Sequence, residues 1–363
     1  MTAGSRDRPV AIGVWTAIGC LLLSLAAITL VAVGIAGTVE HAPLPVTLGL
    51  VGGLFAVLVA IVAEWRFLRT LVIRARWEHS STRPSRERPD QLIGRLADRP
   101  GAREDGAIAV AIVAGAIVTY GLAVEGEVSV VLGASLVGVG AGLLFPHRAV
   151  PAYCGAFVGM TSPAVLGSYA STAAAAVAAS MLFLVARPVY QGVGGKLGTT
   201  AFVGVVSITL LASSETPTTM IPDPTTAAMA LAVGGLAAAA TFLLHVRLTG
   251  DTVLASGLVG VAAAIGLPFL PVGDGAFLAA TAFGASFAGM TDTGRISHTR
   301  WVAVAGLLVG VLVVATAPFL AGTGGKLGTI AFAASLAVHA TLRTSERTRR
   351  DLLREVRYRR DTT

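Results

Sequence analysis

The sequence predicts an all-α integral membrane protein, with two N-terminal transmembrane helices followed by a five-plus-five repeat of inverted topology, about twelve membrane segments in all. Three observations predict this fold class. The chain is 54% hydrophobic and 13% charged, with a mean hydropathy of +0.77, which is too apolar for a soluble domain of 363 residues. Its larger part repeats itself, and its arginines are distributed as expected for two copies that enter the bilayer from opposite sides.

The N-terminal unit, residues 1–73, contains two apolar runs over 10–36 and 47–66. The first run is longer than a signal-peptide core and lacks a small-residue cleavage site, so we expect a retained anchor. A basic, proline-containing stretch over 74–106 follows, which we interpret as a cytoplasmic linker rather than a domain.

An internal duplication is indicated by two nearly identical stretches, GVGGKLGT at Gly192–Thr199 and GTGGKLGT at Gly322–Thr329. They contain the only two lysines of the chain. The same shift pairs FVGMT (157–161) with FAGMT (287–291), and a slightly smaller shift pairs Val131–Val139 with Val253–Val261. We therefore assign repeat 1 to residues 107–213 and repeat 2 to 226–342.

Each copy offers five apolar segments. They are 107–124, 129–146, 150–162, 168–187 and 199–213 in the first copy, then 226–245, 252–269, 275–290, 301–319 and 329–342 in the second. An odd number of crossings turns the second copy over, and the charges agree with that inversion. The uncharged turn 161–168 faces outward, whereas its counterpart carries Arg295 and Arg300 and faces inward.

The resulting topology places every arginine on the cytoplasmic side of the plasma membrane, together with both termini. The connector 214–225 is extracytoplasmic, and Lys326 is the sole basic residue expected outside. The arginine-rich tail 343–363 either lies on an anionic inner leaflet or continues the last span as a solvated helix.

The lysine stretches are the first candidate site. Pro188 and Pro318 stop the preceding helix, the glycines permit sharp turns, and the following segment, expected to begin near Thr199 or Thr329, is short for a full crossing. Amides at a helix start, a lysine and a threonine hydroxyl together favour a small anion or carboxylate. The candidate residues are Gly194, Gly195, Lys196, Gly198, Thr199, Gly324, Gly325, Lys326, Gly328 and Thr329.

Other roles for the lysines stay open. A side chain can snorkel from a loop to the lipid headgroups without a functional role. Alternatively, each ammonium acts as a tethered cation or forms a salt bridge with a carboxylate such as Asp292. A nucleotide-binding loop is excluded because the Gly-x-x-x-x-Gly-Lys-Ser/Thr spacing is missing.

The Gly-Met-Thr turns are the second candidate site. Their small residues are typical of close helix packing, and the functional alternative places Thr161, Ser162, Thr291 and Asp292 at a pore mouth facing the lysines. Phe157 and Phe287 would then act as gates. Among the scattered histidines, His339 is the candidate for a proton-sensitive group.

The Gly-Gly-Lys-Leu-Gly-Thr stretches resemble, in kind, the Gly-Gly-x-Gly-Thr loops in the two halves of glutamate/sodium symporters. The resemblance covers only these loops, which here contain one extra residue. It implies a five-plus-five inverted-repeat transporter and no particular substrate.

We therefore expect a channel or secondary transporter for a small anion or carboxylate, acting at the interface of the repeats. A cation channel or carrier with structural lysines is one alternative, and a membrane sensor or scaffold acting through the linker and tail is another. No paired acids, nucleophile with base, or metal-ligand spacing indicates an enzyme, so we expect no catalytic residue, metal or cofactor. The expected partners are the permeant and a bilayer with an anionic inner leaflet, with homo-oligomers left open and no nucleic acid.

Overall fold

The computed structural model describes residues 8–39, 51–66, 101–212 and 216–361, and every regular element in these ranges is a helix. Four of the described helices are long and apolar enough to cross a membrane: Val14–Ala36, Ala102–Val124, Pro224–Thr249 and Thr252–Phe269. Several further apolar helices are shorter. The described fold fits an α-helical membrane protein. Most of the predicted linker, 74–100, lies outside the described residues.

After the N-terminal helices, the described elements follow the same order twice. The first series is α4 (Ala102–Val124), α5 (Val130–Leu144), η1 (Pro146–Arg148), α6 (Ala149–Gly159), α7 (Tyr169–Val185) and α8 (Lys196–Leu211). The second is α9 (Pro224–Leu244), η2 (His245–Thr249), α10 (Thr252–Gly266), η3 (Leu267–Phe269), α11 (Gly275–Gly289), α12 (Thr299–Ala315) and α13 (Lys326–Asp361). Two elements differ clearly in length: α11 has 15 residues against 11 in α6, and α13 has 36 against 16 in α8.

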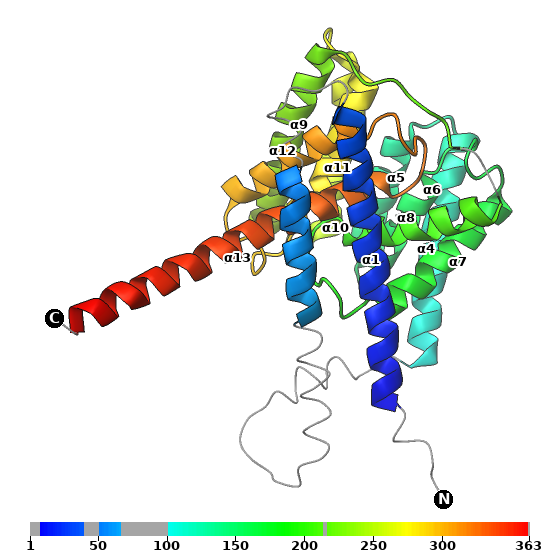
Figure 1. The fold of residues 1–363 in the computed structure, drawn as a ribbon. Coiled ribbons are helices and arrows are strands. Elements are labelled where there is room, and N and C mark those ends of the chain that lie inside the picture. Colours follow the sequence, from blue (N-terminus) through cyan, green and yellow to red (C-terminus); the bar gives the residue numbers. More distant parts are fainter. Residues whose placement is uncertain (1–7, 40–50, 67–100, 213–215, 362–363) are drawn as a thin grey trace, which may run out of the picture.

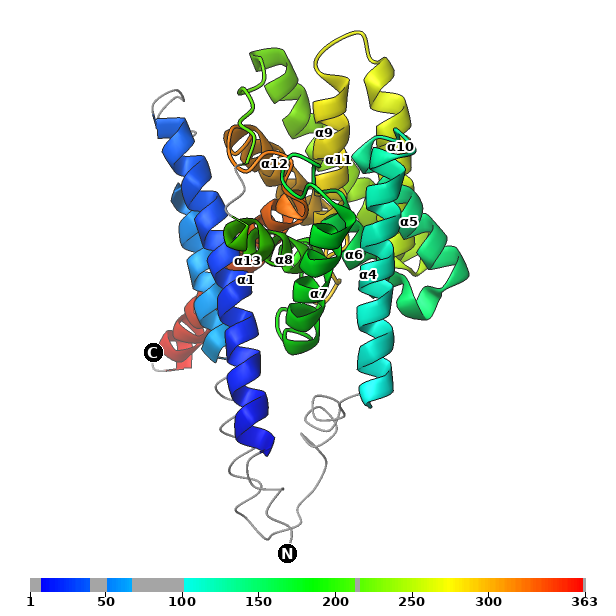
Figure 2. The same ribbon diagram turned by 90° about the vertical axis from the view of Figure 1, so that its right-hand side faces the viewer.

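Two helices flank these series, α1 (Arg8–Val39) and a helix over residues 51–66. Both are blue in Figures 1 and 2 and lie along one side of the bundle. α1 contacts α7, α8, α12 and α13, so it covers elements of both series.

The two series meet along α5 and α10, and also where α8 and α13 cross near their N-terminal ends in the centre of the bundle (Figure 2). A Cβ atom added at Gly198 would lie 2.5 Å from the Cα atom of Gly328, and one added at Gly328 would lie 2.5 Å from the Cα atom of Gly198. Backbone atoms occupy the space of a side chain at both positions. The crossing therefore requires glycine on both helices.

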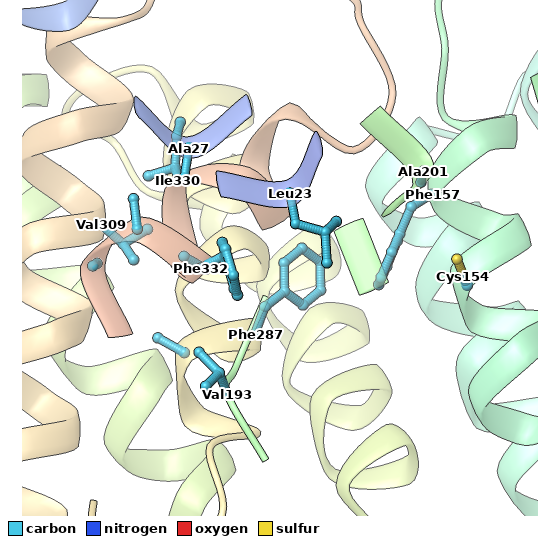
Figure 3. Close-up of a cluster of buried hydrophobic side chains, with 14 of the residues drawn as sticks. Leu23, Ala27, Cys154, Phe157, Val193, Ala201, Phe287, Val309, Ile330 and Phe332 are labelled. Carbon is cyan, nitrogen blue, oxygen red and sulfur yellow. The ribbon is translucent and has the colours of Figure 1, made fainter. Parts of the chain in front are cut away.

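An apolar cluster surrounds this crossing and joins α1 to both series (Figure 3). Its labelled members are Leu23, Ala27, Cys154, Phe157, Val193, Ala201, Phe287, Val309, Ile330 and Phe332, all of them buried. The full cluster also contains many alanines, which is typical of membrane helices because close van der Waals packing holds such helices together.

Two sequence-based expectations about helix boundaries are wrong. We expected the lysines to lie in loops before helices that begin near Thr199 and Thr329, but each lysine is the first residue of its helix. The reason is that the glycine before the lysine already has a left-handed backbone, with φ of +83° at Gly195 and +80° at Gly325, and ends the loop there.

We also expected a short last segment in repeat 2. Instead, α13 runs for 36 residues through the tail as a single helix, seen in red in Figure 1. No glycine or proline follows Gly328 to stop it.

The crossing yields a stability prediction. Gly198→Ala should lower the free energy of unfolding by about 1–3 kcal/mol, because the new methyl group must push two backbones apart. Thermal unfolding of the detergent-solubilised protein, followed by size-exclusion chromatography, measures the change.

Gly140→Ala is the matched control, because Gly140 is also helical and nothing lies within 4 Å of an added Cβ atom. We expect it to be neutral or slightly stabilising. A Gly198→Ala protein as stable as the Gly140→Ala protein would contradict the assigned crossing.

Candidate functional site

The first glycine loop, residues 186–195 between α7 and α8, sits on the Gly-Met-Thr turn of the second series. The amide of Gly194 donates to the Thr291 hydroxyl at 3.1 Å. The amide of Asp292 donates back to the carbonyl of Gly192 at 2.9 Å. The loop and the turn thus each donate one hydrogen bond to the other, although they lie far apart in the sequence.

The second glycine loop, residues 316–325 between α12 and α13, makes the equivalent contacts with the first series. The amide of Gly324 donates to the Thr161 hydroxyl at 3.2 Å. The amide of Ser162 donates to the carbonyl of Gly322 at 2.8 Å. Each loop therefore rests on the turn of the other copy, and the two predicted sites form one assembly.

The loops also share an unusual backbone. Tyr190 and Leu320 hold equivalent positions and both have a φ of +51°. A left-handed conformation of a bulky residue costs on the order of 1–3 kcal/mol and persists only where the surroundings impose it. Because two different side chains adopt it, the strain belongs to the loop design and not to one residue.

The lysine ammonium groups are bound by backbone carbonyls. Lys196 Nζ donates to the carbonyl of Ala186 at 2.7 Å and to that of Arg187 at 3.1 Å. Lys326 Nζ donates to the carbonyls of Thr316 and Phe319. Ala186 and Thr316 are the C-cap residues of α7 and α12, where the helix dipole favours a cation. An ammonium has three N–H donors, so each lysine keeps one beyond these two bonds.

The remaining predicted polar ligands are largely used by the fold. The hydroxyls of Thr199 and Thr329 donate to the carbonyls of Gly195 and Gly325, both at 3.2 Å. The carboxylate of Asp292 accepts from the amide of Gly294 at 2.7 Å. Within the described residues, neither lysine forms a hydrogen bond or an ion pair with Asp292, so the salt-bridge alternative has no support there.

The two predicted gate residues touch each other. The ring centroids of Phe157 and Phe287 are 4.6 Å apart, and Tyr153 and Phe283 extend the group to four buried rings. Each phenylalanine carbonyl also lies against a loop, because a Cβ atom at Gly194 would be 2.3 Å from the Phe287 oxygen. The four rings therefore fill the space between the two places where a glycine loop contacts a Gly-Met-Thr turn.

Sequence reasoning missed a pair of threonines. Thr119 and Thr241 are fully buried, and their hydroxyls have no hydrogen-bond partner in the described structure. They hold equivalent places beside the Gly-Met-Thr turns, since Cβ atoms added at Gly159 and Gly289 would lie 2.8 and 2.6 Å from their Cβ atoms. Orphaned buried hydroxyls are uncommon and require an explanation. The shift that pairs residues 131–139 with 253–261 also pairs these threonines, so the signal was present.

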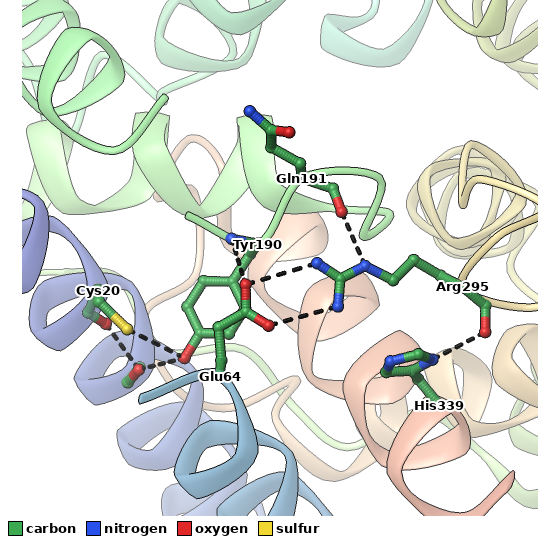
Figure 4. Close-up of polar contacts among 7 residues, drawn as sticks. Cys20, Glu64, Tyr190, Gln191, Arg295 and His339 are labelled. Carbon is green, nitrogen blue, oxygen red and sulfur yellow. Dashed lines mark hydrogen bonds and ion pairs between the residues drawn. The ribbon is translucent and has the colours of Figure 1, made fainter. Parts of the chain in front are cut away.

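A polar cluster ties the first loop to the N-terminal helices (Figure 4). Glu64, on the helix over 51–66, accepts a hydrogen bond from the amide of Tyr190 at 3.0 Å. The Tyr190 hydroxyl lies 2.7 Å from the Ser24 hydroxyl of α1. Tyr190 is thus held at both its amide and its hydroxyl by the N-terminal helices.

Arg295 completes the cluster from the loop after α11. It pairs with Glu64 at 3.3 Å and donates through Nε to the carbonyl of Gln191 at 2.8 Å. His339 Nδ1 lies 2.7 Å from the carbonyl oxygen of Arg295, which places the candidate proton-sensitive group inside this cluster. Glu64 lies within the apolar run 47–66, and nothing in the sequence links it to Arg295.

Comparisons with protein-family models, with curated proteins and with solved structures find no match.

Replacing the Thr161 and Thr291 hydroxyls, which accept hydrogen bonds from the glycine loops, tests the contact between loops and turns. Thr291→Val leaves the buried Gly194 amide without an acceptor, so we expect a loss of about 1–3 kcal/mol in the free energy of unfolding. Thr161→Val should cost a similar amount through Gly324. Thermal unfolding in detergent measures both.

Thr200→Val provides the control, because the Thr200 hydroxyl is also buried but donates only to the Lys196 carbonyl of its own helix. Its loss should be clearly smaller. Equal losses of unfolding free energy in all three variants would show that the hydrogen bonds from the loops to Thr161 and Thr291 contribute no more than a bond within a helix.

Proposed function

We propose that the protein is a membrane transport protein that moves a small anion or carboxylate along the interface of two inverted repeats. The proposal rests on one observation: each glycine loop contacts the Gly-Met-Thr turn of the other series through equivalent hydrogen bonds. Two inverted copies related by a pseudo-two-fold axis would make such contacts. The repeated element order and the arginine distribution support the same five-plus-five topology.

Each glycine loop, together with the Gly-Met-Thr turn it contacts, would form one half of the pathway. A half-site combines the third donor of a lysine ammonium, first-turn amides of α8 or α13, and an orphaned threonine hydroxyl of the opposite copy. Gly195, the N-cap of α8, has no side chain to accept from those amides. All these groups present hydrogens or positive charge, which favours a negative solute.

The aromatic cluster would separate the two half-sites. Phe157 and Phe287 are in contact, so the described conformation corresponds to a closed pathway in this proposal. Permeation would require these rings to separate or rotate, as in hydrophobic gating.

A cation pathway is the competing function, and one observation favours it. Each lysine ammonium is coordinated by carbonyl oxygens, the ligands that a transported cation would find in a broken helix. In that case the lysines are structural tethered cations. Reversal potentials of proteoliposomes under separate anion and cation gradients distinguish the two functions.

Charge removal at the lysines is the direct test. Lys196→Met and Lys326→Met should each reduce anion flux into proteoliposomes about tenfold or more, because a full charge is lost from a poorly solvated site. Lys196→Arg is the matched control, since it keeps the charge and the donors to the helix carbonyls. Unchanged anion flux in both methionine variants, with correctly assembled protein, would refute the anion pathway.

The orphaned hydroxyls allow a test in which stability and function change in opposite directions. The double variant Thr119→Val, Thr241→Val removes two unpaired buried hydroxyls at nearly constant shape, so the free energy of unfolding should stay equal or rise by about 1 kcal/mol. Flux should fall if the hydroxyls contact the permeant. A stable variant with wild-type flux would remove them from the pathway.

A further inference from the structure

A cavity of about 190 Å³ lies between the helix over 51–66 and α13. Its walls combine charged groups with small apolar ones. It is lined by Val59, Ala60, Ala63, Glu64, Arg295, Leu336, His339, Ala340, Arg343 and Thr344. The proposed pathway uses none of these residues.

An apolar groove of about 400 Å³ continues from this cavity along the helix over 51–66. The two spaces share Val59 and Ala63 as lining residues. Phe55, Leu58 and Val62 form the rest of the apolar wall, and Phe55 is 68% exposed. A ligand that fills both spaces needs a polar end and an extended apolar part.

The charges of the cavity determine the sign of the polar end. Glu64 and Arg295 form an ion pair and leave no net charge. Arg343 adds one positive charge, and none of the ion pairs among the described residues includes it. The cavity therefore favours a ligand with a single negative charge, such as a phosphodiester.

We propose that this cavity and groove bind one anionic phospholipid, with the phosphate at Arg343 beside Arg295 and an acyl chain along Phe55, Leu58 and Val62. Basic pockets between membrane helices at the cytoplasmic face bind lipid phosphates in this way. The site rests on the membrane embedding and on the inward-facing arginines, and it does not depend on transport. Because Arg295 also holds Glu64 and the first glycine loop, the bound phosphate would lie next to the contact that fixes this loop.

The test measures lipid retained by the full-length protein, purified in mild detergent, by native mass spectrometry. Short-chain phosphatidylglycerol, phosphatidylcholine and inorganic phosphate are the three probes. We expect retention of phosphatidylglycerol only, reduced about tenfold or more by Arg343→Gln, the scale of one lost charge-assisted hydrogen bond.

Two further variants complete the design. Arg247→Gln removes an exposed arginine of η2 that lines neither space and should retain phosphatidylglycerol like the wild type. Ala63→Trp fills the junction of cavity and groove at an exposed position and should abolish retention.

Several results would overturn the proposal. Equal retention of phosphatidylcholine would show a general annular lipid, and binding of inorganic phosphate without phosphatidylglycerol would show a plain anion site. Unchanged retention in Arg343→Gln and Ala63→Trp would place the lipid elsewhere. A lipid-free dimer that is broken by Ala63→Trp would show that a second copy covers the groove. None of these results depends on a flux measurement, so the transport proposal stands or fails separately.

Discussion

The close approach of Gly198 and Gly328 is the constraint on which the rest of the structure depends. Only where neither helix has a side chain can the two helix starts cross with their backbones in contact. This contact brings each glycine loop within hydrogen-bond reach of the other copy's Gly-Met-Thr turn. Buried backbone amides need hydrogen-bond partners, and here the opposite series supplies them. The two copies cannot be separated without leaving those amides unsatisfied.

The lysines satisfy buried backbone carbonyls at the other end of each loop. A helix that stops inside a membrane leaves carbonyl groups without partners. Lys196 and Lys326 donate to these carbonyls at the ends of α7 and α12. The structure alone therefore accounts for a lysine at both positions. In the proposed function, the third N–H donor of each ammonium, which the carbonyls leave over, would contact the permeant.

The sequence predicted the helical, membrane-type class, and it singled out the glycine loops and the Gly-Met-Thr turns without predicting that each loop contacts the turn of the other series. These features follow from composition and from self-similarity, which do not depend on tertiary detail. The start of α8 at Lys196 was missed because the left-handed Gly195 can end a loop at a position that propensity does not mark. The ion pair of Glu64 with Arg295 was also missed, because 231 residues separate its partners and no local pattern links them. Thr119 and Thr241 occupy equivalent positions in the sequence, but only the structure shows that both hydroxyls are buried without a partner among the described residues.

The two loops are equivalent in shape but are held by different means. In the first loop, the peptide group before Tyr190 is fixed through its amide by Glu64 of the N-terminal helix. In the second, the peptide group before Leu320 is fixed through its carbonyl, that of Phe319, by Lys326. This one peptide group is thus held within its own series in the second loop, whereas in the first loop it is held by the helix over 51–66. Arg295 binds both Glu64 and the first loop, so it reinforces the contact of the helix over 51–66 with this loop. The equivalent peptide groups therefore differ in what fixes them, although α1 packs on the second loop as well, since a Cβ atom added at Gly34 would lie 3.0 Å from the Thr316 side chain.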